Sequence, residues 1–422
     1  MIAILGGGIS GLTAAYFLSK KGHKVLILEK EGDVGGLAAS FEKEGEFFPL
    51  TYHHIMECDL EWQNLCKELG LKIFWRGVKI GFHTNKGIYR IATPFDILKF
   101  APLKFQDRIR LGLLGLRLML DKNWKKYQKM TAENFIIKMA GKKVYERIFL
   151  HLLKSKFGKD YKKITASWLA FRLSKRESKG IFGFVDRGLK EFVSRLEKKI
   201  KDNNGEIVKN ALINQIKIEN NKISEISYTL GNKLVKIQPD LVLNTLPGPV
   251  FLELTKGLPT DLGKRIEKIR YRSVVSCIVK LNKKLSDYYW LNILDKQTSF
   301  ATIFDYGRIS GRKDSILYLS SYVDSGDKFW NLDKKEIFNR YIEDLEKIYP
   351  QARENVEWFE VFKLRYAKAI YECGYENYCL NIKTSVDNLF FSSMDLFPPM
   401  RNIGFAIKNA KEASKIIASF KK

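Results

Sequence analysis

The stretch AILGGGISGLTAAYFL, from Ala3 to Leu18, places a short apolar segment directly before three consecutive glycines. Ile2 to Leu5 has the composition of a buried strand, and Leu12 to Lys20 carries apolar residues at helical spacing. Lys24 to Leu28 resembles a second strand, and Glu29 follows it directly. This order predicts a strand, a glycine turn, a helix and a second strand.

The glycines match the spacing GxGxxG at Gly6, Gly8 and Gly11. In such a motif the first glycine allows a tight turn, the second lets the backbone approach a pyrophosphate, and the third lets the helix pack against the strand. The helix N-terminus offers N–H groups and the positive end of a dipole to phosphates. Glu29 lies 18 residues after Gly11, near the usual spacing for a carboxylate that binds ribose hydroxyls. These features favour dinucleotide binding over a plain structural turn.

The length of 422 residues loosely predicts two or three domains, and the net charge is +26. This charge favours an acidic partner, such as an anionic substrate or an anionic membrane surface, although a lysine-rich solubilising surface explains it equally well. Nucleic acid is the least favoured partner, because the basic residues are spread along the whole chain without a zinc-finger, RNP or basic-zipper motif.

The five cysteines are widely spaced without a CxxC motif, and their odd number argues against a disulfide framework and a structural zinc site. The sequence contains neither a secretory signal nor a run of the roughly 18–20 apolar residues that span a bilayer. We therefore expect a cytoplasmic protein without a metal site.

One segment has the pattern of a basic amphipathic helix. LGLLGLRLML, from Leu111 to Leu120, contains Arg117, and Arg108 and Arg110 precede it. A helix packed on the protein's own core explains this pattern, and peripheral contact with a membrane is the alternative.

A second glycine pair, Gly35-Gly36, follows Glu29 and Lys30 and precedes Leu37. The GxGxxG motif, the acid and this glycine pair together resemble the FAD fingerprint of the flavin amine oxidase superfamily. That superfamily includes protoporphyrinogen oxidases, phytoene-type desaturases and, more distantly, UDP-galactopyranose mutases. The resemblance implies an α/β fold, in which a Rossmann-like FAD-binding domain is interleaved with an α+β substrate-binding domain.

Two downstream segments extend the resemblance. Ile213 lies in a segment that resembles the strand whose backbone meets the adenine. Asn388 to Phe391 and Arg401 to Ala413 resemble the terminal FAD segment, in which a strand leads into a helix whose N-terminus faces the flavin pyrimidine ring. By strict spacing the family's acid would fall at Met394, whereas the acid in this sequence is Asp395.

The resemblance implies FAD as the cofactor. No cysteine lies in the terminal FAD segment, so we expect non-covalent binding. The cofactor-binding residues that the resemblance implies are Gly6, Gly8, Ile9, Ser10, Gly11, Glu29, Lys30, Gly35, Gly36, Leu37, Ile213, Asp395, Arg401, Asn402 and Ile403.

His53 and His54 are the strongest catalytic candidates, because the family's stretch at this place passes near the isoalloxazine. A histidine near its reference pKa shuttles protons or binds acidic groups, while a buried, hydrogen-bonded pair that only shapes the loop is the alternative. Adjacent histidines in a strand point to opposite faces, so a metal site is not expected here.

Arg365 to Tyr375 resembles the family's RxxxAxPxYxxGH stretch, which lies beside the flavin and the substrate, and Tyr371 in it is a third catalytic candidate. Ile370 stands where proline is usual, and Tyr375 where histidine is usual. Ser276 takes the place of a lysine that amine oxidases of the family carry near flavin N5, which argues against amine oxidation. The candidates for binding an anionic substrate group are Arg76, Arg90, Arg172 and Arg365.

The two predicted domains interleave along the chain. The FAD-binding domain is assigned residues 1–75, 181–265 and 384–422, and the substrate-binding domain residues 76–180 and 266–383. Within the second domain, Ile73 to Ile91 and Val274 to Leu281 predict strands of one sheet, and Trp124 to Arg172 predicts helices, with Thr131 as an N-cap.

The sequence therefore predicts an FAD-dependent oxidoreductase of the protoporphyrinogen oxidase and desaturase type. It would transfer a hydride from a largely apolar, acid-bearing small molecule to flavin N5, with oxygen, a quinone or another acceptor reoxidising the flavin. Two alternatives stay open: a non-redox flavoenzyme that acts on a sugar nucleotide, as UDP-galactopyranose mutases do, and a non-catalytic flavin-binding subunit.

Overall fold

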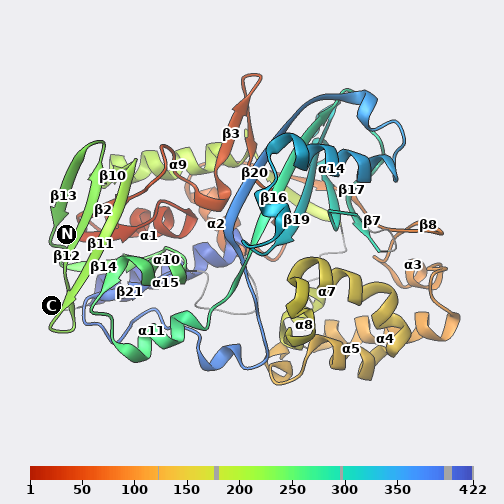
Figure 1. The fold of residues 1–422 in the computed structure, drawn as a ribbon, viewed down its shortest axis with the longest axis horizontal. Coiled ribbons are helices and arrows are strands. Elements are labelled where there is room, and N and C mark those ends of the chain that lie inside the picture. Colours follow the sequence, from red (N-terminus) through yellow and green to blue (C-terminus); the bar gives the residue numbers. More distant parts are fainter. Residues whose placement is uncertain (122, 175–179, 295–297, 394–401, 421–422) are drawn as a thin grey trace.

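The computed structural model describes residues 1–121, 123–174, 180–294, 298–393 and 402–420 of the chain. Figure 1 shows a parallel sheet with its helices on the left, and long antiparallel strands above a group of helices on the right. Both chain ends lie in the left-hand region, so segments from the beginning, middle and end of the sequence meet there.

Five parallel strands form the first sheet, in the order β10-β2-β1-β14-β21. Their bounds are Glu206–Val208 (β10), Val25–Leu28 (β2), Ile2–Leu5 (β1), Leu241–Asn244 (β14) and Leu389–Phe391 (β21). The last four strands are buried at every residue, as in a parallel sheet covered on both faces. Helices α1 (Ile9–Ser19), α9 (Gly188–Asp202) and α15 (Ile403–Ser419) pack beside them. This arrangement confirms the predicted Rossmann-like α/β fold.

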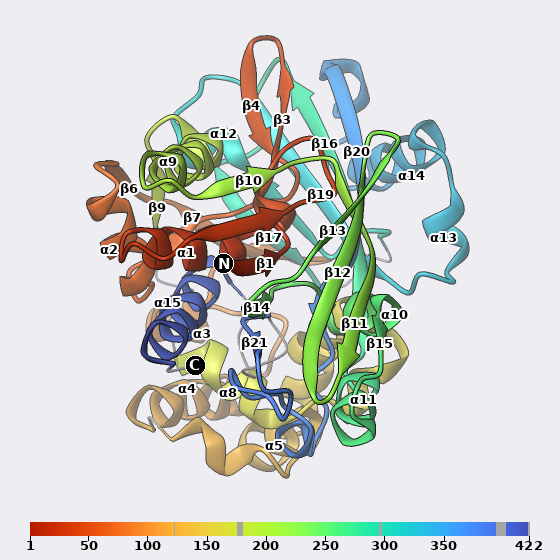
Figure 2. The same cartoon turned by 90° about the vertical axis from the view of Figure 1, so that its left-hand side faces the viewer.

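A separate antiparallel layer lies beside the parallel sheet (Figure 2). Its strands are β13 (Lys233–Ile237), β12 (Lys222–Leu230) and β11 (Ala211–Glu219), and the short β15 (Thr255–Lys256) pairs with β11. Asn388 ties this layer to the parallel sheet. Its side chain accepts from Ile223 N–H at 2.8 Å and donates to the carbonyls of Ile223 and Asp240 at 3.1 and 3.3 Å.

A seven-stranded sheet forms the centre of the second region, in the order β20-β16-β19-β18-β17-β7-β8. The strands are Val356–Ala369, Tyr271–Leu281, Ser315–Val323, Thr302–Asp305, Tyr288–Ile293, Lys79–Thr84 and Gly87–Tyr89, in that order. Residues Val275 and Cys277 pack under α14 (Lys334–Glu346), whereas Ile278 faces an aromatic cluster on the other side of the sheet.

One strand differs from the sequence prediction. The sequence predicts that Ile73 to Ile91 forms strands of this large sheet, and β7 and β8 do so. The strand β6 (Ile73–Gly77) instead pairs with β9 (Ile181–Val185), which also pairs with β5 (Ile55–Met56). The reason is a competing partner: β9 lies more than 100 residues downstream and supplies the ladder that β6 completes.

The segment between β8 and β9 is largely helical, as the sequence predicts. Its α-helices of five or more residues are α3 (Pro94–Leu98), α4 (Phe105–Leu120), α5 (Ala132–Ala140), α7 (Leu150–Phe157) and α8 (Ala166–Ser174). The predicted N-cap at Thr131 is confirmed, because its hydroxyl accepts from Asn134 N–H at 3.2 Å. The boundaries of the two predicted domains stay predictions.

Replacing Asn388, which connects the two sheets through hydrogen bonds, should destabilise the fold. We expect Asn388→Ala to lower the free energy of unfolding by about 2–4 kcal/mol, because it leaves a buried N–H group and two carbonyls without their partner. Urea unfolding followed by circular dichroism measures the change. The control Asn214→Ala removes one exposed hydrogen bond to Thr229 and should cost less than about 1 kcal/mol. Equal losses in the two variants would contradict this role of Asn388.

Candidate functional site

The two glycine motifs of the sequence lie directly against each other. Gly35 N–H donates to the carbonyl of Gly7 at 2.8 Å, and Gly8 and Gly35 form an isolated parallel bridge. A Cβ atom on Gly36 would lie 3.2 Å from Gly8 Cα. The backbones of the two motifs therefore lie so close that a side chain at position 36 would be crowded.

Gly11 is required by packing within the protein, whereas Gly8 is not. A Cβ atom on Gly11 would lie 2.0 Å from the carbonyl oxygen of Gly6, so the packing of α1 on the turn itself excludes a side chain. A Cβ atom on Gly8 would meet protein only at 4.0 Å, and the Gly8 φ of −71° suits any residue. The chain's own packing does not require glycine at Gly8, which fits a ligand that passes over it.

The start of α1 fits an anionic group. Ile9 and Ser10 begin the helix after Gly8, no side chain caps its N-terminus, and its first turn carries no acid. The N–H groups of a first helical turn have no partner within the helix, and they sit at the positive end of its dipole. A pyrophosphate is the kind of group that such an N-terminus binds.

Glu29 is fixed at the end of β2. Its buried carboxylate accepts from Gly7 N–H at 2.7 Å and from Glu31 N–H at 2.9 Å. A carboxylate has about four acceptor positions, so these bonds leave capacity for ribose hydroxyls. The Glu29 carbonyl accepts from Ala211 N–H at 2.8 Å, which brings the start of β11, and with it Ile213, to this edge of the sheet.

Helix α15 starts on the same side as the loop before α2 (Leu60–Glu68). The Asn402 side chain accepts from Phe405 N–H and donates to Asp59, each at 2.9 Å. Ile403 is buried in the first turn. Lys30, by contrast, is exposed, and Asp395 and Arg401 lie outside the described residues. The cofactor role of each of these residues stays a prediction.

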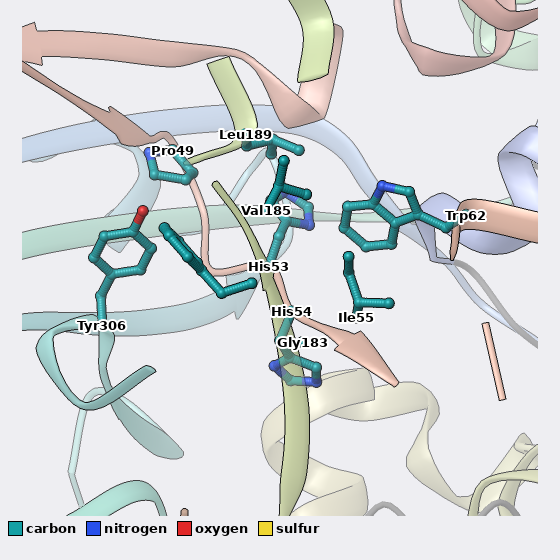
Figure 3. Close-up of a pocket in the computed structure, with 10 residues that line it drawn as sticks. Pro49, His53, His54, Ile55, Trp62, Gly183, Val185, Leu189 and Tyr306 are labelled. Carbon is teal, nitrogen blue, oxygen red and sulfur yellow. The ribbon is translucent and has the colours of Figure 1, made fainter. Parts of the chain in front are cut away.

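Figure 3 shows His53 and His54 with their rings on opposite sides of the chain. Both residues line a cavity of about 20 Å³. His53 Nε2 donates to the carbonyl of Leu37 at 3.1 Å, and Thr51 Oγ1 lies 3.0 Å from the same nitrogen. His54 Nδ1 lies 2.8 Å from the Tyr289 hydroxyl, and its ring packs on Phe182 with 4.2 Å between centroids. His53 therefore faces the second glycine motif, and His54 faces the aromatic cluster.

Burial keeps both imidazoles neutral. Burial, together with smaller contributions from His53 and Arg172, lowers the pKa of His54 to about 3. Burial also lowers the pKa of His53, and its hydrogen bond to Leu37 opposes that shift. At neutral pH each ring is a hydrogen-bonding group without a positive charge.

The aromatic cluster continues along the sheet. Tyr52 stacks on Phe304 with 3.6 Å between ring centroids, and Phe304 also packs on Trp290 at 4.8 Å. Burial raises the pKa of Tyr52 well above its ordinary value, and the neighbouring Tyr322 raises it further. The Tyr52 hydroxyl stays protonated, so it remains a hydrogen-bond donor.

Three cations from three elements lie next to this cluster. Lys368 of β20 lies over Trp168 at 4.8 Å and over Tyr322 at 5.3 Å, and Lys156 of α7 lies over Tyr322 at 5.8 Å. Arg172 of α8 lies over Trp168 at 5.5 Å. Lys156 and Lys368 are only 9% and 8% exposed, which is rare for lysine.

Two buried hydroxyls face each other on the large sheet. Ser276 of β16 pairs with Ser320 of β19, so both side chains point to the same face. Neither hydroxyl has a hydrogen-bond partner among the described residues, and both are buried. Buried polar groups are normally bonded, so this position fits a polar ligand atom or an ordered water.

The other candidates are dispersed. Tyr371 is buried against Tyr375, and its carbonyl accepts from Thr165 N–H, away from the histidine cavity. Arg365 lines a larger cavity of about 330 Å³, where Tyr366 adopts a left-handed φ of 53°. Arg76 and Arg90 are exposed.

Sequence reasoning missed the two buried lysines. The chain has 73 lysines and arginines, and no spacing marks these two. Their tertiary contacts with aromatic rings, Trp168 and Tyr322 among them, distinguish these lysines.

Comparisons with known proteins agree with the geometry at the glycine motifs. A family described as flavin-containing amine oxidoreductase matches residues 9–396. An L-amino-acid oxidase of Naja atra is 21% identical over 388 residues, which is 84% of this chain and 73% of the relative. A 4,4'-diapophytoene desaturase of Staphylococcus haemolyticus is 47% identical over 59 residues, which is 14% of this chain and 12% of that protein.

A solved structure shares the whole fold. A provisionally assigned protoporphyrinogen oxidase from Exiguobacterium sp. 255-15 aligns with a TM-score of 0.76 at 14% identity, over 99% of this chain and 98% of that one. At this identity the likeness concerns the fold alone.

Within the ranges given above, no helix is long and apolar enough to cross a membrane. No group of three His, Cys, Asp or Glu side chains that could hold a metal occurs among the placed residues.

Two alanine substitutions should separate cofactor binding from folding. We expect Gly8→Ala to weaken FAD binding at least about tenfold, because the added methyl group would occupy the space predicted for the pyrophosphate. The stability of the cofactor-free protein should change by less than about 0.5 kcal/mol, because that methyl group meets protein only at 4.0 Å. Gly11→Ala should lower the free energy of unfolding itself, because its methyl group meets Gly6. Fluorescence titration with FAD and urea unfolding measure the two effects. A stable Gly8→Ala variant that binds FAD normally would contradict the assignment.

The lowered pKa of His54 should make stability depend on pH. In the unfolded chain the imidazole takes up a proton as the pH falls below its ordinary pKa of 6.5, whereas the folded one resists protonation down to about 3. The stability contributed by neutral His54 is therefore present above the ordinary pKa and is lost as the pH falls toward the folded pKa. We expect the free energy of unfolding to fall more steeply between about pH 7 and about pH 5 in the wild type than in His54→Gln. Equal slopes in urea unfolding would show that His54 is not held neutral.

Proposed function

Because this chain belongs to the family of flavin-containing amine oxidoreductases, we propose that it dehydrogenates a largely apolar, acid-bearing small molecule. It is an FAD-dependent oxidoreductase. We infer non-covalent binding of FAD, because no cysteine follows Cys379 in the sequence. When bound, FAD would supply the acceptor for the two electrons of a substrate C–H bond. The proposal includes peripheral membrane association, because a largely apolar substrate partitions into lipid.

The cations beside the aromatic cluster are the observation that supports the proposal. Lys156 and Lys368 are buried, Arg172 is half-buried, and the charge of Arg172 acts on both Tyr52 and His54. A substrate carboxylate would be attracted by the positive charge of these cations. The aromatic rings would cover the apolar body of the substrate, as in most small-molecule sites.

The neutral side chains orient the substrate in this proposal. An imidazole with a strongly lowered pKa is a weak base, so we assign His54 to positioning through its bond to Tyr289. Tyr52 keeps its proton and can donate a hydrogen bond to the substrate. The aromatic side chains of Phe182, Trp290 and Phe304 exclude water around these polar groups.

Anaerobic reduction of the bound flavin tests the proposed reaction. We expect protoporphyrinogen, an apolar diacid, to bleach the oxidised flavin at concentrations at least about tenfold lower than its dimethyl ester, because the ester cannot pair with the cations. An L-amino acid should not bleach it, since Ser276 replaces the lysine of amine oxidases. If amino acids reduced the flavin as well as apolar acids did, the proposed substrate class would be wrong.

Two further outcomes would favour the alternative functions. Conversion of a sugar nucleotide only by the reduced protein would favour the mutase alternative. Reoxidation of the flavin only in the presence of a partner protein would favour the subunit alternative.

A substitution at the cation cluster tests which residues bind the acid. Lys368→Met keeps the side-chain length and removes the charge, so it should raise KM for the diacid at least about tenfold with a smaller effect on kcat. The ester should respond little to the same substitution. The matched control Lys233→Met removes an exposed lysine on β13 and should change neither constant.

A further inference from the structure

Helices α3 and α4 expose a dense set of apolar side chains. Seventeen large apolar residues are exposed in the part of the chain that the structure places, and eight of them fall between positions 95 and 120. These eight are Phe95, Leu98, Phe105, Ile109, Leu113, Leu116, Met119 and Leu120. Concentrations of this kind on one surface mark binding sites.

The exposed residues of α4 form a stripe opposite its buried face. At roughly 100° per residue, the positions 105, 109, 113, 116 and 120 fall within an arc of about 80°. The buried residues of the helix are Asp107, Leu111, Leu114 and Leu118, which lie on the other side. The buried residues of α4 already pack against the protein core, so the exposed stripe is a second apolar face without a core contact. Phe105, Leu113 and Leu120 are 62%, 59% and 75% exposed.

Positive charges flank the outward stripe. By the same helical spacing, Arg108 lies on one side of the stripe, and Arg110 and Arg117 lie on the other. Arg108 also donates to the carbonyls of Leu103 and Leu98 at 2.8 and 2.6 Å, which holds α3 against the start of α4.

The segment from 94 to 120 has five basic residues and two acids. Asp96 is used in the capping box of α3, and Asp107 is buried with Arg110 at 3.3 Å. The exposed edge of this surface is therefore positive.

We propose that α3 and α4 dock on a membrane surface that contains anionic lipids, with α4 lying in the plane of the interface. The apolar stripe would enter the boundary between headgroups and acyl chains, and the arginines would reach the lipid phosphates. Each basic residue near an anionic leaflet strengthens the attraction. A second copy of the chain fits less well, because a two-fold contact would place the same arginines opposite one another.

This surface lies on the outer side of the helical layer that carries part of the candidate site. α4 packs on α8, and α8 carries Trp168 and Arg172. The proposed function already includes peripheral membrane association, and the present proposal identifies the surface that would bind the lipid. It does not depend on the proposed reaction, since lipid binding is measured without turnover.

Co-sedimentation of the FAD-loaded full chain with lipid vesicles tests the proposal. The wild type should bind vesicles of phosphatidylcholine with phosphatidylglycerol, and it should bind pure phosphatidylcholine more weakly. The double variant Leu113→Gln and Leu116→Gln should lower binding at least tenfold, and glutamine retains helix propensity. Arg117→Glu should weaken binding to the anionic vesicles only.

Matched controls keep the test sharp. Leu212→Gln with Leu234→Gln removes two exposed leucines from β11 and β13 and should leave vesicle binding unchanged. Flavin absorbance and circular dichroism should be normal in every variant. Absence of wild-type binding to either vesicle, or equal loss in the control pair, would overturn the proposal. A dimer in gel filtration that the Leu113 and Leu116 variant abolishes, without vesicle binding, would assign the surface to a second copy instead.

Discussion

The contact between the Gly8 backbone and the Gly35-Gly36 backbone is the constraint on which the rest of the site depends. A Cβ atom on Gly36 would lie 3.2 Å from Gly8 Cα, and Gly36 has a left-handed φ of 57°, so this close contact favours glycine at position 36. It fixes where the chain leaves the parallel sheet after β2. From Gly36 the chain reaches Leu37, whose carbonyl accepts from His53 at 3.1 Å. His54 then lies 2.8 Å from Tyr289 of the large sheet, so a continuous series of short contacts links the glycine turn to the second region.

That series also explains the charge states of the site. The loop with both histidines is covered by aromatic side chains from β9, β17 and β18, and this burial removes the water that would stabilise imidazolium. Positive charge is carried instead by Lys156, Arg172 and Lys368, which lie over aromatic faces. Cation–π contacts offset part of the desolvation cost of a buried cation. Neutral imidazoles beside these cations suit the proposed binding of an acidic substrate group better than proton shuttling.

Local sequence patterns predicted the parts of the fold that depend on neighbouring residues. The glycine turn, the strands β1 and β2, and the cap at Thr131 all follow from residue types within a few positions of one another. The pairing of β6 with β9 could not be predicted from local sequence, because β9 lies more than 100 residues downstream and meets β6 only in the folded protein. Nor did the pairing of Ser276 with Ser320, which depends on the register between β16 and β19. The burial of Lys156 and Lys368 could not be predicted either, because the side chains around them come from α7, α8, β19 and β20, which are far apart in the sequence.

The helical layer between β8 and β9 has an unusual distribution of polarity. A surface helix normally turns apolar residues inward and charges outward. Here α4 presents an apolar stripe to the outside, whereas α7 and α8 hold Lys156 and Arg172 toward the interior. Exposed leucines are costly in water, and this cost falls if lipid covers the outer face. In the proposed function, an acidic group binds at the inner face. The same layer would then admit an apolar molecule from a membrane and hold its acidic end beside the aromatic cluster.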